Sequence, residues 1–229
     1  MSINKNIEEI KNQIKNACIK AERKDLPKLI AVSKTKPYTD VLEAVKAGQY
    51  DFGENYIQEA MEKIDSINKN DITWHFIGGL QSNKAKFAVK YFDLIHSVDS
   101  MKLAKEINKR AKDIDKVQNI LIQINTGKEE QKSGIMPEDA EKLFKELINL
   151  KNIKILGLMA IPPFGMEEDE AEKHFSLLQK TLQNLNNKFE NLGMTELSMG
   201  MSDDFHIAIK FGATMVRVGT KIFGERNYK

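Results

Sequence analysis

The chain has 229 residues, 30% charged and 41% hydrophobic, and its single cysteine excludes an internal disulfide framework and suits a reducing compartment. Lys and Arg total 35 against 33 for Asp and Glu, a net charge of +2, which argues against a nucleic-acid or membrane-surface protein. We find no signal peptide and no apolar run long enough to span a bilayer, so we expect a cytoplasmic protein.

The first predicted element is an N-terminal helix within residues 1–25. Its apolar side chains recur at helical spacing at Ile3, Ile7, Ile10, Ile14 and Cys18. We expect one face of this helix to pack on the outside of the domain that follows.

Short apolar runs and amphipathic stretches then alternate to the end of the chain. The apolar runs predict eight strands at Leu29–Lys34, Asp51–Asn55, Thr73–Gly78, Leu94–Asp99, Asn119–Asn125, Ile153–Ile161, Glu196–Ser202 and Met215–Thr220. The amphipathic stretches between them predict helices near Thr39–Ala47, Tyr56–Ile67, Ser82–Lys90, Met101–Lys112, Pro137–Leu150, Asp169–Leu192 and Asp204–Phe211.

This alternation predicts the fold class. Strands separated by helices indicate parallel βαβ units, and eight such units predict a closed (β/α)8 TIM barrel, a fold of typically ~250 residues. The alternative, a doubly wound open sheet, usually carries a glycine-rich phosphate fingerprint after its first strand. Here that strand is followed by Thr35-Lys36-Pro37. We therefore predict one α/β domain over residues 1–229, with no second domain after the last strand.

Lys34 ends the first predicted strand. Catalytic and binding groups of a TIM barrel come from the C-terminal ends of its strands and the loops beyond them. Lysine is also the side chain whose pKa falls readily on burial, which gives the neutral amine that Schiff-base chemistry needs. The alternative is a lysine that simply extends into solvent, as most lysines do. Lys36 would share its face if the strand continues.

The segment Ser198-Met-Gly-Met-Ser-Asp-Asp204 is the strongest signal for an anion. A strand ends there, Gly200 allows close backbone approach, and a helix begins behind Ser and Asp caps. Loops seven and eight of this fold are its usual phosphate site, and Gly219-Thr220 adds donors. The alternative is only a capped helix start. Asp203 and Asp204 would repel a dianion unless their carboxylates turn away.

Arg217 lies inside the last predicted strand. Arginine is almost never buried unpaired, so it has either a carboxylate partner or a ligand acceptor. The histidines His75, His96, His174 and His206 do not have metal-ligand spacing, and we predict no metal site.

Seven motifs in chain order identify a family resemblance. They are Leu29-Ile-Ala-Val-Ser-Lys-Thr-Lys-Pro37, Phe52-Gly-Glu-Asn55, Trp74-His-Phe-Ile-Gly78, Leu80-Gln-Ser-Asn-Lys84, Gly157-Leu-Met-Ala160, Leu197-Ser-Met-Gly-Met-Ser-Asp-Asp204 and Val216-Arg-Val-Gly-Thr220. Together they resemble the pyridoxal phosphate homeostasis proteins, the YggS/PROSC family, which shares the barrel of fold-type III enzymes such as alanine racemase.

The resemblance implies a site for pyridoxal 5′-phosphate (PLP), held as a Schiff base on Lys34. Arg217 would face the pyridine nitrogen. The phosphate would lie near Ser198, Gly200, Ser202, Gly219 and Thr220, and the ring pocket would be lined by Asn55, His75 and Met159. Lys36 and Lys132 match further lysines of the family that handle the cofactor in transit. Lys221 replaces a residue that is usually small, and adds charge either near the phosphate loops or on the rim.

The resemblance and the residues together favour a PLP carrier over an enzyme. An arginine cannot give up its proton, so the ring nitrogen stays unprotonated and the ring is a weak electron sink. Alanine racemase takes a second acid/base, a tyrosine, from its partner's C-terminal domain, and we expect this chain to lack that domain. We therefore expect a monomer in PLP (vitamin B6) homeostasis, with apo-enzymes that require PLP as recipients. The alternatives are an amino-acid racemase of low activity and, with less support, a Schiff-base aldolase.

Overall fold

A computed structural model describes residues 2–129, 133–163 and 165–225. Within these residues, eight parallel strands pair in chain order and close into a barrel, because β1 pairs with both β2 and β8. The strands are β1 Lys28–Val32, β2 Asp51–Glu54, β3 Thr73–Phe76, β4 Leu94–Val98, β5 Gln118–Gln123, β6 Ile153–Met159, β7 Glu196–Ser198 and β8 Met215–Val218. The predicted α/β TIM barrel is confirmed.

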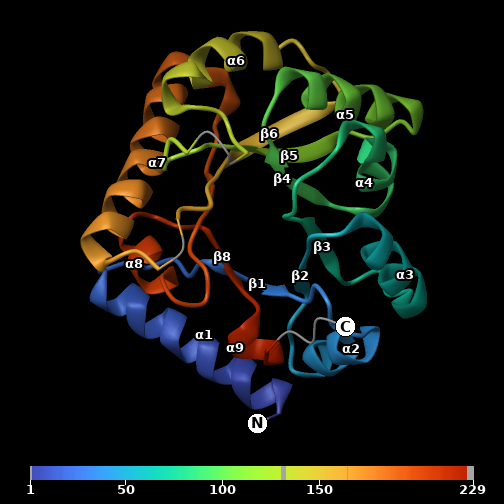
Figure 1. Cartoon of the computed structure of the whole chain (residues 1–229), viewed down its shortest axis with the longest axis vertical. Helices are drawn as coiled ribbons and strands as arrows, with labels where there is room; N and C mark the ends of the chain where they lie inside the picture. Colours follow the sequence, from blue (N-terminus) through green and yellow to red (C-terminus); the bar gives the residue numbers. More distant parts are fainter. Residues whose placement is uncertain (1, 130–132, 164, 226–229) are drawn as a thin grey trace.

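The helices form the outer layer around this ring of strands (Figure 1). They are α1 Ile3–Lys20, α2 Tyr38–Lys46, α3 Ile57–Ile67, α4 Ala85–Tyr91, α5 Met101–Asp113, α6 Ala140–Leu147, α7 Glu168–Lys188, α8 Phe205–Lys210 and α9 Thr220–Phe223, with short 3₁₀ turns at Ser82–Lys84, Pro137–Asp139 and Glu190–Leu192. None of the helices in the described residues combines the length and the apolar character needed to cross a membrane.

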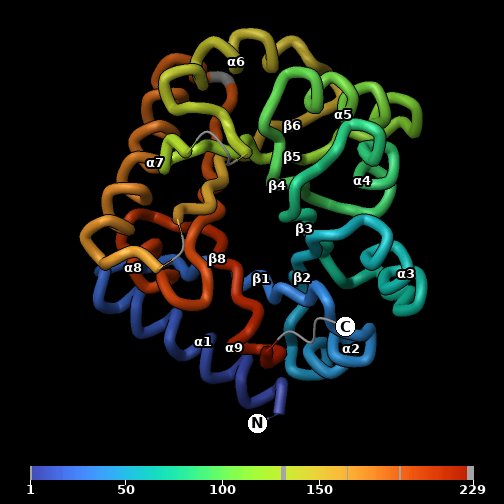
Figure 2. The backbone as a smooth tube through the Cα atoms, viewed as in Figure 1, coloured from blue at the N-terminus to red at the C-terminus, as the bar shows by residue number. Residues whose placement is uncertain are grey.

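The first helix lies outside the barrel, as the spacing of its apolar residues predicts. Ile7, Ile10, Ile14 and Cys18 are buried on one face of α1, which runs along α8 and α9 (Figures 1 and 2). The helix begins at Ile3 behind the cap Ser2, and it ends at Lys20 rather than near residue 25. The reason is that Glu22 takes a left-handed backbone with φ of 54°, which an α-helix cannot continue through.

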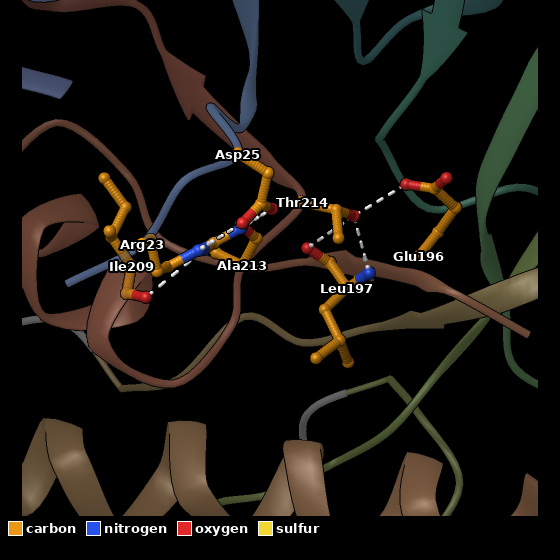
Figure 3. A network of polar contacts seen from close by, with 7 residues as sticks. All are labelled: Arg23, Asp25, Glu196, Leu197, Ile209, Ala213 and Thr214. Carbon is orange, nitrogen blue, oxygen red and sulfur yellow. Dashed lines mark hydrogen bonds and ion pairs between the residues drawn. The ribbon is translucent and has the colours of Figure 1, made fainter. Parts of the chain in front are cut away.

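The last two strands are joined partly by side chains. β7 and β8 pair through Ser198 and Met215, and Thr214 adds a second link by accepting from the Leu197 N–H at 2.9 Å and donating to Glu196 at 2.6 Å (Figure 3). Nearby, Arg23 donates to the backbone oxygens of Ile209 and Ala213. These bonds fix the α8–β8 connection against the segment that leads into β1.

Several strands end earlier than the apolar runs predict. β1 ends at Val32 rather than Lys34, β7 at Ser198 rather than Ser202, and β8 at Val218 rather than Thr220. A left-handed residue follows each of the first two ends, Thr35 with φ of 63° and Gly200 with φ of 87°. A left-handed residue cannot extend a strand, so these segments are free to form loops at the mouth of the barrel.

The barrel interior is apolar in part and polar in part. Its apolar contacts join Ile30, Leu94, Leu121, Met159 and Met215. The larger core lies between the strands and the helices. The remaining interior space is taken by buried polar side chains, which lead to the site described next.

Candidate functional site

A cavity of about 690 Å³ opens at the C-terminal ends of the strands. It brings together five of the predicted site residues on its wall: Lys34, Asn55, Ser202, Arg217 and Thr220. The rest of the wall consists largely of apolar side chains, among them Val32, Ile77, Ile161, Met166 and Ile207, together with the acids Asp203, Asp204 and Glu225. Side chains from β1, β8 and the loops after β1, β2 and β7 therefore meet in one place, although they are far apart in sequence.

Lys34 lies in a tight turn after β1. The turn is closed by the Lys36 N–H, which donates to the Ser33 oxygen at 3.1 Å. The strand ends at Val32, so the condition under which Lys36 would share the face of Lys34 is not met. The Lys36 ammonium instead donates to the backbone oxygen of Glu225 at 2.6 Å, on the rim of the cavity.

A buried ionic cluster of Ser33, Glu54, Glu59 and Lys63 holds this turn from below. Lys63 donates to Glu54 at 2.6 Å, to the Ser33 carbonyl at 2.8 Å and to Glu59 at 3.0 Å, and so satisfies all three of its donors. Glu59 also accepts the Thr35 N–H at 2.6 Å. The strained left-handed Thr35 is therefore tied to helix α3, and the direction in which Lys34 leaves the backbone is fixed by the cluster.

The Glu54 carboxyl is the most deeply buried charged member of the cluster, with 0% exposure beside 4% for Lys63. Burial raises its pKa, and the adjacent Lys63 ammonium opposes the shift. The charged form of Glu54 therefore depends on the Lys63 ammonium, since an unpaired carboxylate in this buried position would destabilise the fold.

Asn55 contributes an unused acceptor to the cavity. Its side-chain oxygen is buried and has no hydrogen-bond partner within the described part of the chain. Gly78 makes room for this segment, because a Cβ at Gly78 would lie 2.2 Å from the Asn55 carbonyl oxygen. A buried unpaired amide oxygen on a cavity wall is available to a donor on a ligand.

The loop after β7 presents donors to the cavity. Asp204 accepts the Met201 N–H at 2.5 Å, and Asp203 lies 3.7 Å from the Lys221 ammonium. Lys221 also donates to the Ser202 carbonyl at 2.6 Å. Both acids that would repel an anion are thus engaged within the protein, and Lys221 adds positive charge beside the loop.

The N–H groups of Ser202, Asp203 and Thr220 make no hydrogen bond to any described residue. The hydroxyls of Thr220 and Ser202 lie 3.5 Å apart across the same corner. Backbone donors, hydroxyls and the charge of Lys221 together make this corner suited to a phosphate or another small oxyanion.

Gly200 shapes that loop, and we expect Gly200→Ala to lower the free energy of unfolding by about 2–4 kcal/mol. Its φ is 87°, and a Cβ there would lie 2.7 Å from the Ala208 Cβ and 2.8 Å from the Phe205 Cα. The matched control is Gly193→Ala, where φ is 54° but nothing lies within 4 Å of the added carbon. The control should cost only about 1–2 kcal/mol by urea denaturation. Equal costs for the two variants would contradict the packing argument.

Arg217 is buried without a carboxylate partner among the described residues. Its guanidinium donates to the Ser198 hydroxyl at 2.6 Å and to the Ala160 carbonyl at 2.9 Å. Burial lowers its pKa to about 10, with Asp204 acting against the shift, so the group stays charged at neutral pH. A charged, buried donor on a cavity wall favours a ligand acceptor over an ion pair within the protein.

The other predicted residues lie beside or beneath the cavity wall. His75, Met159 and Ser198 are buried in the barrel interior, where Met159 packs in the apolar cluster. Gly200 and Gly219 are backbone positions next to lining residues. Lys132 lies outside the described residues.

Sequence reasoning missed four residues: Glu54, Glu59, Lys63 and His96. Glu54 is part of the Phe52–Asn55 motif, yet nothing in the sequence pairs it with a lysine one helix later. His96 reads as one more residue of an apolar strand. Its role depends on Ser198, which lies 102 residues away in the sequence.

Comparisons with known proteins identify the family of this chain. The family model for the N-terminal domain of alanine racemase matches residues 3–227. A pyridoxal phosphate homeostasis protein from Haemophilus influenzae is 44% identical, covering 100% of this chain and 98% of the relative. One from Aquifex aeolicus is 41% identical, covering 97% of each.

Solved structures also resemble the chain in fold. The structure of PipY from Synechococcus elongatus PCC7942 with PLP bound has a TM-score of 0.87 and 37% identity, covering 97% of this chain and 100% of that one. An alanine racemase from Clostridium difficile has a TM-score of 0.73 at 17% identity, covering 95% of this chain and 57% of that one, which supports the fold alone.

Proposed function

Because the chain belongs to the family of pyridoxal phosphate homeostasis proteins, we propose that it binds pyridoxal 5′-phosphate and serves the homeostasis of this cofactor. We further propose that Lys34 holds the cofactor as a Schiff base. One observation carries the proposal: a single cavity collects a lysine amine, a corner of unused backbone donors and a charged arginine.

The residues of the cavity fit the parts of the cofactor. When bound, PLP supplies an aldehyde that condenses with a primary amine, together with a phosphate and a pyridine nitrogen. The Lys34 amine suits the aldehyde, and the donors of Ser202 and Thr220 suit the phosphate. The Arg217 guanidinium suits the ring nitrogen, which is an acceptor, and the unpaired Asn55 oxygen accepts from a ring substituent.

The same residues favour a PLP carrier over a PLP-dependent enzyme. Arg217 donates a hydrogen bond but keeps its proton, so it does not support the protonated ring that carbanion chemistry needs. The described lining residues include no tyrosine or histidine, and two of the three acids that line the cavity are engaged, Asp204 with the Met201 N–H and Asp203 with Lys221. We therefore propose a cytoplasmic, monomeric carrier that passes PLP to apo-enzymes.

A titration followed by a transfer assay tests this function. The apoprotein is titrated with PLP while its visible absorption is recorded, and the loaded protein is then mixed with an apo-enzyme that requires PLP. We expect saturable binding and recovery of the apo-enzyme's activity. Absorption that never departs from that of free PLP, with PLP in excess, would contradict the proposal. Sustained, Lys34-dependent loss of optical activity from a single amino acid would favour the racemase. Trapping of a sugar phosphate without cofactor would favour the aldolase.

A further inference from the structure

A continuous chain of polar side chains crosses the barrel interior beneath the cavity. It starts at Arg217, whose Nη1 lies 2.6 Å from the Ser198 Oγ, and Ser198 lies 2.9 Å from the Nδ1 of His96. The Nε2 of His96 is 3.0 Å from the Nδ1 of His75, and the Nε2 of His75 is 3.0 Å from Oδ1 of Asp51. The chain thus connects β8, β7, β4, β3 and β2 through side chains rather than backbone.

Elementary donor chemistry gives every bond in this chain one direction. The Asp51 carboxylate can only accept, so the Nε2 of His75 donates to it, and the bare Nδ1 of the neutral His75 ring is an acceptor. The Nε2 of His96 therefore donates to His75, which leaves the Nδ1 of His96 to accept the Ser198 hydroxyl hydrogen. The Ser198 oxygen in turn accepts from the Arg217 guanidinium, which can only donate. No other arrangement of neutral rings satisfies all four contacts.

The electrostatics of the interior agree with this direction. Burial lowers the pKa of His96 well below 6.5, and the neighbouring His75, Arg217 and Lys28 lower it further, so the ring is neutral. Burial acts to raise the pKa of Asp51, but His75 and Lys28 outweigh it and the net shift is downward. Asp51 is therefore the anionic end of the chain.

The anionic end opens on the opposite face of the barrel. Asp51 stands at the start of β2 and forms an ion pair with Lys28 at 3.2 Å. Both residues line a hollow of about 360 Å³, together with Lys11 and Tyr50. The chain therefore runs from the cavity at one end of the barrel to solvent at the other.

We propose that His96 and His75 are positioning residues of the cofactor site, which through Ser198 hold the Arg217 guanidinium in the orientation that a ring nitrogen requires. This rests on the proposed function, because Arg217 is taken to contact bound PLP. The two histidines touch no ligand themselves. They act by accepting the Ser198 hydroxyl hydrogen at His96, so that the lone pairs of the Ser198 oxygen face Arg217 and hold its guanidinium.

Acid should weaken the hydrogen bonds through which His96 and His75 hold Arg217. A proton added to the Nδ1 of His96 meets the Ser198 hydroxyl hydrogen that already points at it, so the Ser198 hydroxyl must turn away. The charged groups that face the histidines are Lys28, Asp51 and Arg217, with Asp204 acting on Arg217 from the loop above. Since the folded protein resists protonating His96 while the unfolded chain does not, folding stability should fall as the pH drops below 6.5.

The first test is nitrogen NMR of isotope-labelled histidine in the full chain without ligand. At neutral pH we expect His96 and His75 to be neutral with the proton on Nε2 and a bare Nδ1. A protonated Nδ1 on either ring would overturn the one-way chain. This measurement needs no variant and no cofactor, so its outcome is independent of the proposed function.

The second test measures PLP affinity in His96→Phe, with the exposed His206→Phe as the control. We expect His96→Phe to lose about tenfold in affinity, which corresponds to about 1.4 kcal/mol, and to lose the decline of affinity on acidification. The control should match the unmodified protein. Unchanged affinity and pH dependence in His96→Phe would overturn the positioning role. If the unmodified protein fails to bind PLP, the proposed function is wrong. The NMR result still tests the direction of the hydrogen bonds between Arg217 and Asp51.

Discussion

Lys34→Ala should abolish the visible absorption band that the unmodified protein gains with PLP, and the variant should release the cofactor completely on dialysis. The reason is that Lys34 is the lysine among the described residues of the cavity wall, and a primary amine is needed to form the Schiff base with the aldehyde. Binding through the phosphate corner and Arg217 should remain, as a weaker and reversible association. Absorbance before and after dialysis, together with circular dichroism as a test of folding, measures the effect.

Lys36→Ala is the matched control for this prediction. Lys36 lies two residues further along the same turn, but its ammonium is bound to the Glu225 carbonyl on the rim. The control should keep the absorption band and retain the cofactor. If the two variants lose the band equally, or if Lys34→Ala retains it, the assignment of the Schiff base to Lys34 is wrong.

The second large effect should come from Lys63→Met, which we expect to lower the free energy of unfolding at neutral pH by about 3–5 kcal/mol. Methionine keeps the length of the side chain but leaves the buried Glu54 carboxylate without its counterion, and it removes one donor each from the Ser33 carbonyl and from Glu59. The turn that carries Lys34 should loosen as well, so the affinity for PLP should fall. Urea denaturation of the apoprotein gives the first quantity and absorbance titration the second.

The pH dependence of Lys63→Met has a definite sign. Burial already raises the pKa of Glu54, and loss of Lys63 raises it further, so a neutral Glu54 becomes favoured in the fold. The destabilisation should therefore shrink as the pH falls toward about 5. The exposed Lys109→Met on α5 should change stability by no more than about 0.5 kcal/mol at either pH. A loss of stability in Lys63→Met that grows as the pH falls, or that equals the loss in Lys109→Met, would contradict the proposal that Lys63 stabilises the buried Glu54 carboxylate.

The fold was predictable because it depends on local patterns. Each strand is a short apolar run, each helix has an amphipathic face, and eight repeats of this alternation leave few alternatives to a closed barrel. The ends of the strands were not predictable from the runs alone. Ser33 and Lys34 continue the pattern of β1, yet the left-handed backbone of Thr35, stabilised by Glu59, turns the chain instead.

The site was predictable where one residue carries its own chemistry. Lys34, Arg217 and the loop around Gly200 stand out because an amine, a buried charge and a glycine before a helix each have a limited set of uses. The roles of the supporting residues were not predictable, because each role depends on a hydrogen-bond or ion-pair partner elsewhere in the sequence. His96 depends on Ser198 and Glu54 on Lys63, and only the closure of the barrel and the packing of α3 bring these partners together.

The most direct test of the account locates the cofactor itself. The protein is incubated with PLP, reduced with borohydride, digested and analysed by tandem mass spectrometry for pyridoxyl-modified lysines. We predict one dominant adduct on the peptide that contains Lys34, absent when reduction precedes the addition of PLP. An adduct chiefly on another of the chain's lysines, or modification spread evenly over surface lysines, would contradict the claim that this cavity holds PLP through Lys34.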